Sequence, residues 1–160
     1  LNARSTLVFL LIYLISFTVE VAGVQYGFIF GEYIYGNGLG IKLFDTPLLI
    51  GLNWVMLVYC TAIIAGKLPV PAFLKMIAAS LLMVFYDLVM EHVAPGMKMW
   101  SFEGGYAPLR NYISWFLLAL IFHAGIKAAR IEIVNRIAPL VFYCQGIFFL
   151  VILIIFKLDR

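Results

Sequence analysis

Charged residues are scarce in this sequence. Only 12% of the 160 residues are Asp, Glu, Lys or Arg, whereas 65% are hydrophobic. Soluble domains are nearer a quarter charged and half apolar, so the composition excludes an ordinary soluble domain and indicates a membrane protein. The net charge of +3 is scattered, without a basic run. This excludes the basic patch that nucleic-acid-binding proteins carry, and we expect no nucleic-acid partner.

Cysteine and histidine are nearly absent as well. Cys60 and Cys144 both lie in apolar stretches and lack CxxC spacing, so we expect them to be packing residues. The two histidines, His92 and His123, fall on neighbouring predicted helices but about 18 Å apart along the membrane normal. That separation excludes a shared haem iron. No other ligand cluster is present in the sequence, and we expect neither a metal nor a cofactor.

Long apolar runs, by contrast, are abundant. A membrane-spanning helix needs about 20 mostly apolar residues, and five stretches fit this requirement. They are expected at residues 6–28, 47–65, 71–92, 111–126 and 137–156. No strand-like alternation competes with them, and a backbone that crosses lipid must satisfy its own hydrogen bonds. The sequence therefore predicts an all-α fold, a polytopic transmembrane bundle of about five spans that forms one domain over residues 1–160.

The loops between five spans alternate between two membrane faces, here called side A, which holds the N-terminus, and side B. Six of the eleven basic residues fall on side A, a weak positive-inside signal that favours side A as cytoplasmic. The acidic residues are distributed more unevenly. Of the eight, only Glu132 belongs to side A. This asymmetry indicates that side B is the working face.

Polar residues from four predicted spans converge near side B. The first span runs from A to B, so Glu20 lies about 10 Å inside its B end. Asn53 and Trp54 start the second span at a similar depth, Asp87 lies toward the end of the third, and Asn111 opens the fourth. Ionisable residues inside a span are expensive, and by default they face a cavity or the bundle interior with a functional role.

Each of these residues also has a structural interpretation. Glu20 is then a buried carboxylate bonded to an indole, tyrosine or amide of a neighbouring helix. Asp87 then pairs with Glu91, one turn later on the same helix face, and Glu91 is itself best interpreted as a solvated helix end. Gly23, Gly27 and Gly31 form a small-residue stripe, for which packing within the chain is favoured over dimerisation.

Three runs near the N-terminus resemble the carotenoid biosynthesis protein family, which includes the CruF-type carotenoid 1,2-hydratases. They are residues 20–36 (EVAGVQYGFIFGEYIYG), 39–42 (LGIK) and 47–54 (PLLIGLNW). Further residues follow in the order the family shows: Asp87, Pro95, Trp100, Gly104, Gly105, Tyr106, Pro108, Asn111 and Trp115. The chain departs from the family pattern at Met97 and Lys98, where a second tryptophan is common, and at Ser114, where glycine is usual. Family members are often longer at the N-terminus, and since the chain begins at Leu1, we expect an intact protein of six or seven spans.

The resemblance implies hydration of a linear carotenoid at a terminal double bond, by protonation to a tertiary cation that water captures. Glu20 or Asp87 is then the acid, because burial favours the protonated carboxyl, and the other carboxylate accepts the proton of the water. Aromatic faces stabilise the cation and line a groove for the polyene, and Asn53 and Asn111 position the water. The expected substrate-binding residues are Tyr33, Tyr35, Asn53, Trp54, Trp100, Tyr106, Asn111 and Trp115.

Two alternatives remain open from the sequence. A carotenoid end-group cyclase or isomerase forms the same cation but loses a proton instead of capturing water. A non-enzymatic carotenoid or lipid carrier uses the same aromatic groove, with Glu20 and Asp87 merely structural. The partners expected under any of these readings are a linear carotenoid and membrane lipid, with a homo-oligomer left open. The expected location is the plasma membrane of a prokaryote.

Overall fold

Five long helices make up most of the chain. The computed structural model describes residues 2–158, and the helices in that range are α1 (Ala3–Tyr26), α2 (Leu48–Gly66), α3 (Ala72–Val93), α4 (Leu109–Ala128) and α5 (Ala138–Leu158). All five are long and apolar enough to cross a membrane, which confirms the predicted all-α bundle of five spans. The largest difference from the predicted boundaries is at the start of α1, expected at residue 6 and found at Ala3.

The helix boundaries follow from local sequence signals. Proline directly precedes α2, α3 and α4, at Pro47, Pro71 and Pro108, because proline is tolerated where the helix needs no N–H donor. Asn2 caps α1, with its side-chain oxygen accepting a hydrogen bond from the Ser5 amide at 2.8 Å. At the other end of α1, Gly27 adopts the left-handed conformation (φ 66°) and closes the helix.

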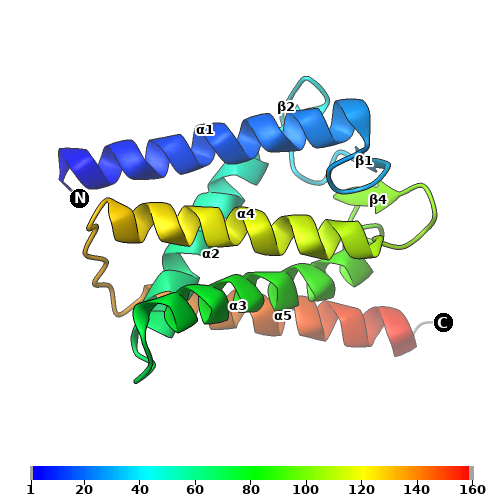
Figure 1. The fold of residues 1–160 in the computed structure, drawn as a ribbon. Coiled ribbons are helices and arrows are strands. Elements are labelled where there is room, and N and C mark those ends of the chain that lie inside the picture. Colours follow the sequence, from blue (N-terminus) through cyan, green and yellow to red (C-terminus); the bar gives the residue numbers. More distant parts are fainter. Residues whose placement is uncertain (1, 159–160) are drawn as a thin grey trace.

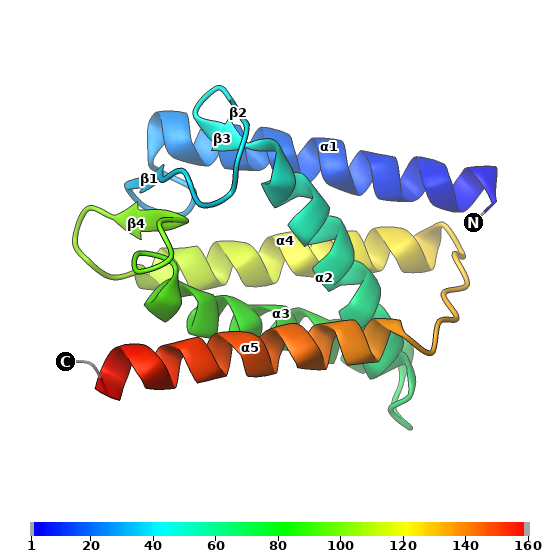
Figure 2. The ribbon, with the colours of Figure 1, turned by 180° about the vertical axis from the view of Figure 1, so that it is seen from behind.

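Four helices run alongside one another while α2 crosses them at a steep angle (Figures 1 and 2). α3 packs on α2, α4 and α5, and α1 packs on α2. The N-terminal end of α1 and the α4–α5 connection lie at one end of the bundle, and the short strands lie at the other (Figure 1). These two ends correspond to sides A and B.

The two long connections on side B form a β ribbon, although the sequence predicts no strand there. β1 (Tyr33–Tyr35) pairs antiparallel with β4 (Trp100–Phe102), with Tyr33 opposite Phe102 and Tyr35 opposite Trp100. A second small pair joins β2 (Lys42–Leu43) to β3 (Thr46–Pro47). Successive strand residues point to opposite faces, and the four aromatic side chains of the ribbon are buried while Ile34 is 70% exposed. The ribbon therefore closes side B of the bundle with aromatic rings.

Candidate functional site

Glu20 is a buried carboxylate that accepts three hydrogen bonds. The phenols of Tyr33 and Tyr35 both donate to Oε2 at 2.8 Å, and the indole Nε1 of Trp54 donates to Oε1 at 2.9 Å. The glutamate is only 3% exposed. Its partners come from β1 and from α2, so two separate segments meet on one side chain of α1. A carboxylate has about four lone-pair sites, so one site remains for a further donor.

The two phenols are held in their donor form. Burial, together with the nearby Glu20 carboxylate, raises the pKa of Tyr33 and of Tyr35 well above the usual value of a phenol. Both groups therefore keep their protons at neutral pH and donate hydrogen bonds to Glu20. The Trp54 indole can only donate. All three partners therefore act as donors, and the two oxygens of Glu20 act as acceptors.

A second carboxyl site lies on α3, where Asp87 and Glu91 share one helix face. The amide Nδ2 of Asn111, on α4, donates to Asp87 Oδ2 at 2.8 Å and lies 3.4 Å from Glu91 Oε1. The indole of Trp100, on β4, donates to Glu91 Oε2 at 3.0 Å. Glu91 is therefore only partly exposed and bonded to two side chains, rather than the solvated helix end that the sequence favours, because β4 folds back over the end of α3.

A small cavity separates the two carboxyl sites. Its volume is about 20 Å³, and both sites border it. A space of this size holds about one water molecule, provided that polar partners surround it. Three carboxyl groups and one amide supply such partners here. The residues that line the cavity are Glu20, Phe30, Tyr33, Tyr35, Ile50, Asp87, Glu91, Trp100, Phe102, Asn111 and Trp115.

Aromatic rings form the remaining walls of this cavity. Trp115 stacks on Trp54 with ring centroids 4.1 Å apart, which joins α4 to α2 beside Glu20. Across the ribbon, Tyr33 packs on Phe102 at 5.3 Å and Tyr35 packs edge-on against Trp100 at 6.2 Å. The faces of such rings attract positive charge. The cavity thus combines carboxyl groups with surfaces that favour a cation.

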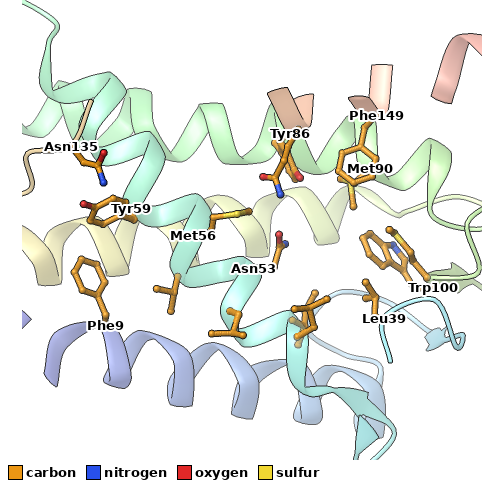
Figure 3. A pocket seen from close by; sticks show the side chains of 16 residues that line it. Phe9, Leu39, Asn53, Met56, Tyr59, Tyr86, Met90, Trp100, Asn135 and Phe149 are labelled. Atoms are coloured by element: carbon orange, nitrogen blue, oxygen red, sulfur yellow. The ribbon is translucent and has the colours of Figure 1, made fainter. Parts of the chain in front are cut away.

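A much larger groove extends from side A to the small cavity. Its volume is about 780 Å³, and its lining is mainly apolar, from α1, α2, α3, α5 and the loops that carry Leu39, Met99 and Asn135. In Figure 3, Asn135 and Trp100 lie toward opposite ends of the groove, with Asn53, Met56 and Tyr86 between them. Ile50 and Trp100 line both the groove and the small cavity. These two side chains are the wall between the two spaces.

Of the ten predicted site residues, seven line the small cavity, Trp54 joins them through its hydrogen bond to Glu20, and two lie elsewhere. Asn53 lines the large groove instead, because it faces away from its neighbour Trp54 on α2. Tyr106 is 76% exposed on the outer surface of side B, past the turn at Gly104 and Gly105 that ends the ribbon. The residues that the structure brings together are Glu20, Tyr33, Tyr35, Trp54, Asp87, Trp100, Asn111 and Trp115. Glu91 and Phe102 join them, although neither was on the predicted list.

Gly23 leaves room for the Tyr33 phenol. A Cβ atom at this position would lie 2.6 Å from Phe30 Cδ2 and 2.9 Å from Tyr33 Oη, so Gly23→Ala must displace the phenol from Glu20. We expect the variant to lower turnover of the protein's substrate by about tenfold, through loss of one hydrogen bond to the carboxylate. The matched control is Gly125→Ala, where an added Cβ meets no atom within 4 Å. Equal turnover in both variants would contradict a role for the hydrogen bond between Tyr33 and Glu20.

Two exposed glutamates on side B give the fold a pH dependence. The Glu32 carboxyl group, through its hydrogen bond and its charge, raises the pKa of Glu103 above the ordinary 4.5. A carboxyl pKa that is raised on folding stabilises the protein fully below the unfolded value, and this contribution is lost as the pH rises through the folded value. Glu103→Gln should therefore raise the unfolding temperature at pH 7, by about 1 °C for an exposed pair, and leave it unchanged at pH 4. Thermal unfolding at both pH values checks this, and a gain of equal size at pH 4 would contradict it.

Comparison with protein families gives one match. A family model described as "Carotenoid biosynthesis protein" matches residues 1–158. Neither the comparison with curated proteins nor the comparison with solved structures gave a significant match. Among residues 2–158, no group of three or more His, Cys, Asp and Glu side chains is arranged to hold a metal ion. The matched region includes both carboxyl sites, the ribbon and the groove.

Proposed function

This chain belongs to the carotenoid biosynthesis protein family, with a role in carotenoid biosynthesis, and from that premise we propose that it is a membrane hydratase. The proposed reaction adds water across the terminal C1–C2 double bond of a linear carotenoid and yields a tertiary alcohol. One observation carries the proposal: two carboxyl sites face each other across a cavity of about 20 Å³, the size of one water molecule. The proposed location is the plasma membrane of a prokaryote.

The Asp87–Glu91 pair is the proposed acid. Two carboxylates that contact the same Asn111 amide in a dry site repel each other when both are charged, so the pair holds one proton between them. Asp87 gives this proton to C2 of the terminal double bond, and the electron pair of the double bond forms the new C–H bond. The positive charge is left on C1, the more substituted carbon. Glu91 remains held by the Trp100 indole throughout.

Glu20 is the proposed base. It accepts three hydrogen bonds, and in the proposed cycle its ionised form accepts one proton of the water in the cavity through its remaining lone pair. As the water oxygen bonds to C1, that proton passes to Glu20, so the net change is the addition of one water molecule. The acid is restored when the proton returns from Glu20 to the Asp87–Glu91 pair through the next water molecule. No oxidant, reductant or cofactor is required by this sequence.

The aromatic wall stabilises the cation between these two steps. Tyr33, Tyr35, Trp100 and Trp115 border the cavity, and ring faces attract a positive charge within about 6 Å. The Glu20 carboxylate adds a full negative charge in a site of low dielectric constant, where such an interaction is strong. The same enclosure limits the reaction to the water molecule held in the cavity.

The groove is the proposed binding site for the rest of the polyene. It is apolar and long, and it ends at Ile50 and Trp100, the two side chains that also border the cavity. A carotenoid chain that lies in this groove places its terminal isoprenoid unit against that wall. Movement of the Ile50 side chain then admits the double bond to the carboxyl groups. Entry from lipid suits a substrate that has no measurable solubility in water.

The proposal is tested in cells that accumulate an acyclic carotenoid such as lycopene. Expression of the protein should convert the pigment to a product heavier by one water molecule per reacted end. A ring-closed product of unchanged mass would instead establish a cyclase. Unaltered pigment that co-purifies with the protein would establish a carrier, and either result would overturn the proposed hydration.

A further inference from the structure

A hollow on the side-B surface lies between the end of α1 and the β ribbon, which Figures 1 and 2 show next to each other. Its volume is about 510 Å³, and its lining includes the polar side chains of Gln25, Glu32, Ser101 and Glu103. We call this hollow the vestibule. Carboxyl, amide and hydroxyl groups all form hydrogen bonds with water. The vestibule therefore suits water, whereas the apolar groove suits a hydrocarbon.

Tyr33 and Phe102 separate the vestibule from the small cavity, because these two residues line both spaces. They form an end pair of the β1–β4 ladder, and their ring centroids lie 5.3 Å apart. Tyr33 is 8% exposed and Phe102 is 9% exposed. Phe102 also borders a second hollow of about 480 Å³ on side B. A single layer of aromatic rings thus lies between the side-B surface and the carboxyl groups of the cavity.

The two rings of this layer differ in what holds them. The Tyr33 phenol donates to Glu20 Oε2 at 2.8 Å, so displacing it breaks a hydrogen bond to a buried carboxyl group, which is costly. The Phe102 side chain has no polar atom and is held by packing alone. Phe102 is also followed directly by the turn at Gly104 and Gly105, which ends the ribbon. Phe102 is therefore the ring that moves at the lower cost.

We propose that the water molecule consumed in the reaction enters the cavity from side B, through the vestibule and past the Phe102 ring. This inference rests on the proposed function, since hydration consumes one water molecule in every turnover. The groove does not supply this water, because the polyene fills it when the terminal double bond reaches the cavity, and its mainly apolar lining offers few hydrogen bonds. The two reactants thus take separate routes, the hydrocarbon past Ile50 and the water past Phe102.

Exchange of the Trp54 indole proton with heavy water tests this route in the purified full chain. Trp54 is fully buried, and its Nε1 donates to Glu20 at 2.9 Å, so this proton exchanges when water reaches the cavity or when the protein unfolds. The backbone amide of Ala119, a fully buried residue of α4, reports unfolding. NMR of protein labelled with ¹⁵N measures both exchange rates, with no substrate present.

Phe102→Ala should accelerate exchange of the Trp54 indole proton by about tenfold or more, as expected when a local barrier to opening is removed. The amide of Ala119 should keep its rate. Phe102→Leu retains an apolar side chain, which guards against a loss of folding, and should give a smaller acceleration in the same direction. Phe44→Ala is the matched control on side B and should change neither rate, because Phe44 is exposed and lies outside the vestibule.

Ile50→Ala distinguishes the two routes, because it opens the wall toward the groove instead. An indole rate that rises in Ile50→Ala as much as in Phe102→Ala would place water entry in the groove and overturn the proposal. Indole rates that stay unchanged in both Phe102 variants, or that rise only in step with the Ala119 amide, would overturn it as well.

The result is separable from the test of the proposed function, because exchange is measured without turnover. Faster indole exchange in the Phe102 variants of a protein that adds no water in cells would overturn the hydratase and support the water route. Water addition by a protein whose indole exchange does not respond to Phe102 would support the hydratase and overturn the water route.

Discussion

Asp87→Asn is expected to lower the rate of carotenoid hydration by about 10²–10⁴-fold, the usual contribution of a general acid. An asparagine has no acidic proton to give to the double bond, so the tertiary cation does not form. The fold should survive, because the new amide has the same shape and its oxygen still accepts the hydrogen bond that Asn111 donates to Asp87 Oδ2 at 2.8 Å. The measurement is the initial rate of alcohol formation from an acyclic carotenoid.

The control for this variant is Glu132→Gln. Glu132 is an exposed acidic residue in the connection between α4 and α5, at the opposite end of the bundle from the cavity. Its substitution makes the same change from a carboxyl group to an amide but should leave the hydration rate unchanged. A rate for Asp87→Asn within a factor of two or so of the control would contradict the role of Asp87 as the acid.

Glu20→Gln is expected to reduce the hydration rate by a similar factor, about 10²–10⁴-fold, for a different reason. The amide carries no charge to stabilise the cation, and it does not accept a proton from water. Trp54 can still donate to the amide oxygen, and the amide nitrogen can donate to the phenol oxygens of Tyr33 and Tyr35. We therefore expect the unfolding temperature to change little, so that a loss of rate reports chemistry and not misfolding.

Tyr35→Phe distinguishes the effect of the Glu20 charge from the effect of the hydrogen bonds that Glu20 accepts. This variant removes one donor to Oε2, at 2.8 Å, but leaves the carboxylate ionised and held by Tyr33 and Trp54. The rate should fall by about tenfold, as expected for one hydrogen bond to a charged group, and so by much less than in Glu20→Gln. If the two variants lost the same fraction of the hydration rate, the charge of Glu20 would not determine that rate.

The helices were predictable from the sequence because each is an apolar run of about the length that a bilayer requires, and in three cases proline marks where it begins. The gathering of Glu20, Asp87 and Asn111 was also predictable, since helix direction and a fixed rise per residue set their depth. Depth alone does not give rotation about the helix axis. Asn53 and Trp54 share a depth, yet one lines the groove and the other bonds to Glu20.

The β ribbon is the main feature that the sequence does not predict. Its signal was present, because Tyr33–Tyr35 and Trp100–Phe102 both place aromatic residues at alternate positions, the pattern of a strand with one buried face. Each strand has only three residues, too few to stand out among the apolar runs. The partial burial of Glu91 depends on this ribbon, since Trp100 reaches it only after the chain has folded back from the end of α3.

The most direct test of the account is the origin of the oxygen in the product. Purified protein is incubated with lycopene in water enriched in the heavy oxygen isotope, beside Asp87→Asn and Glu20→Gln, and the pigments are analysed by mass. Acid-catalysed hydration predicts a tertiary alcohol that carries the heavy isotope, formed without added cofactor and lost in both variants. An unlabelled oxygen in the product, or labelled alcohol at the same rate in both variants, would contradict the two-carboxyl mechanism.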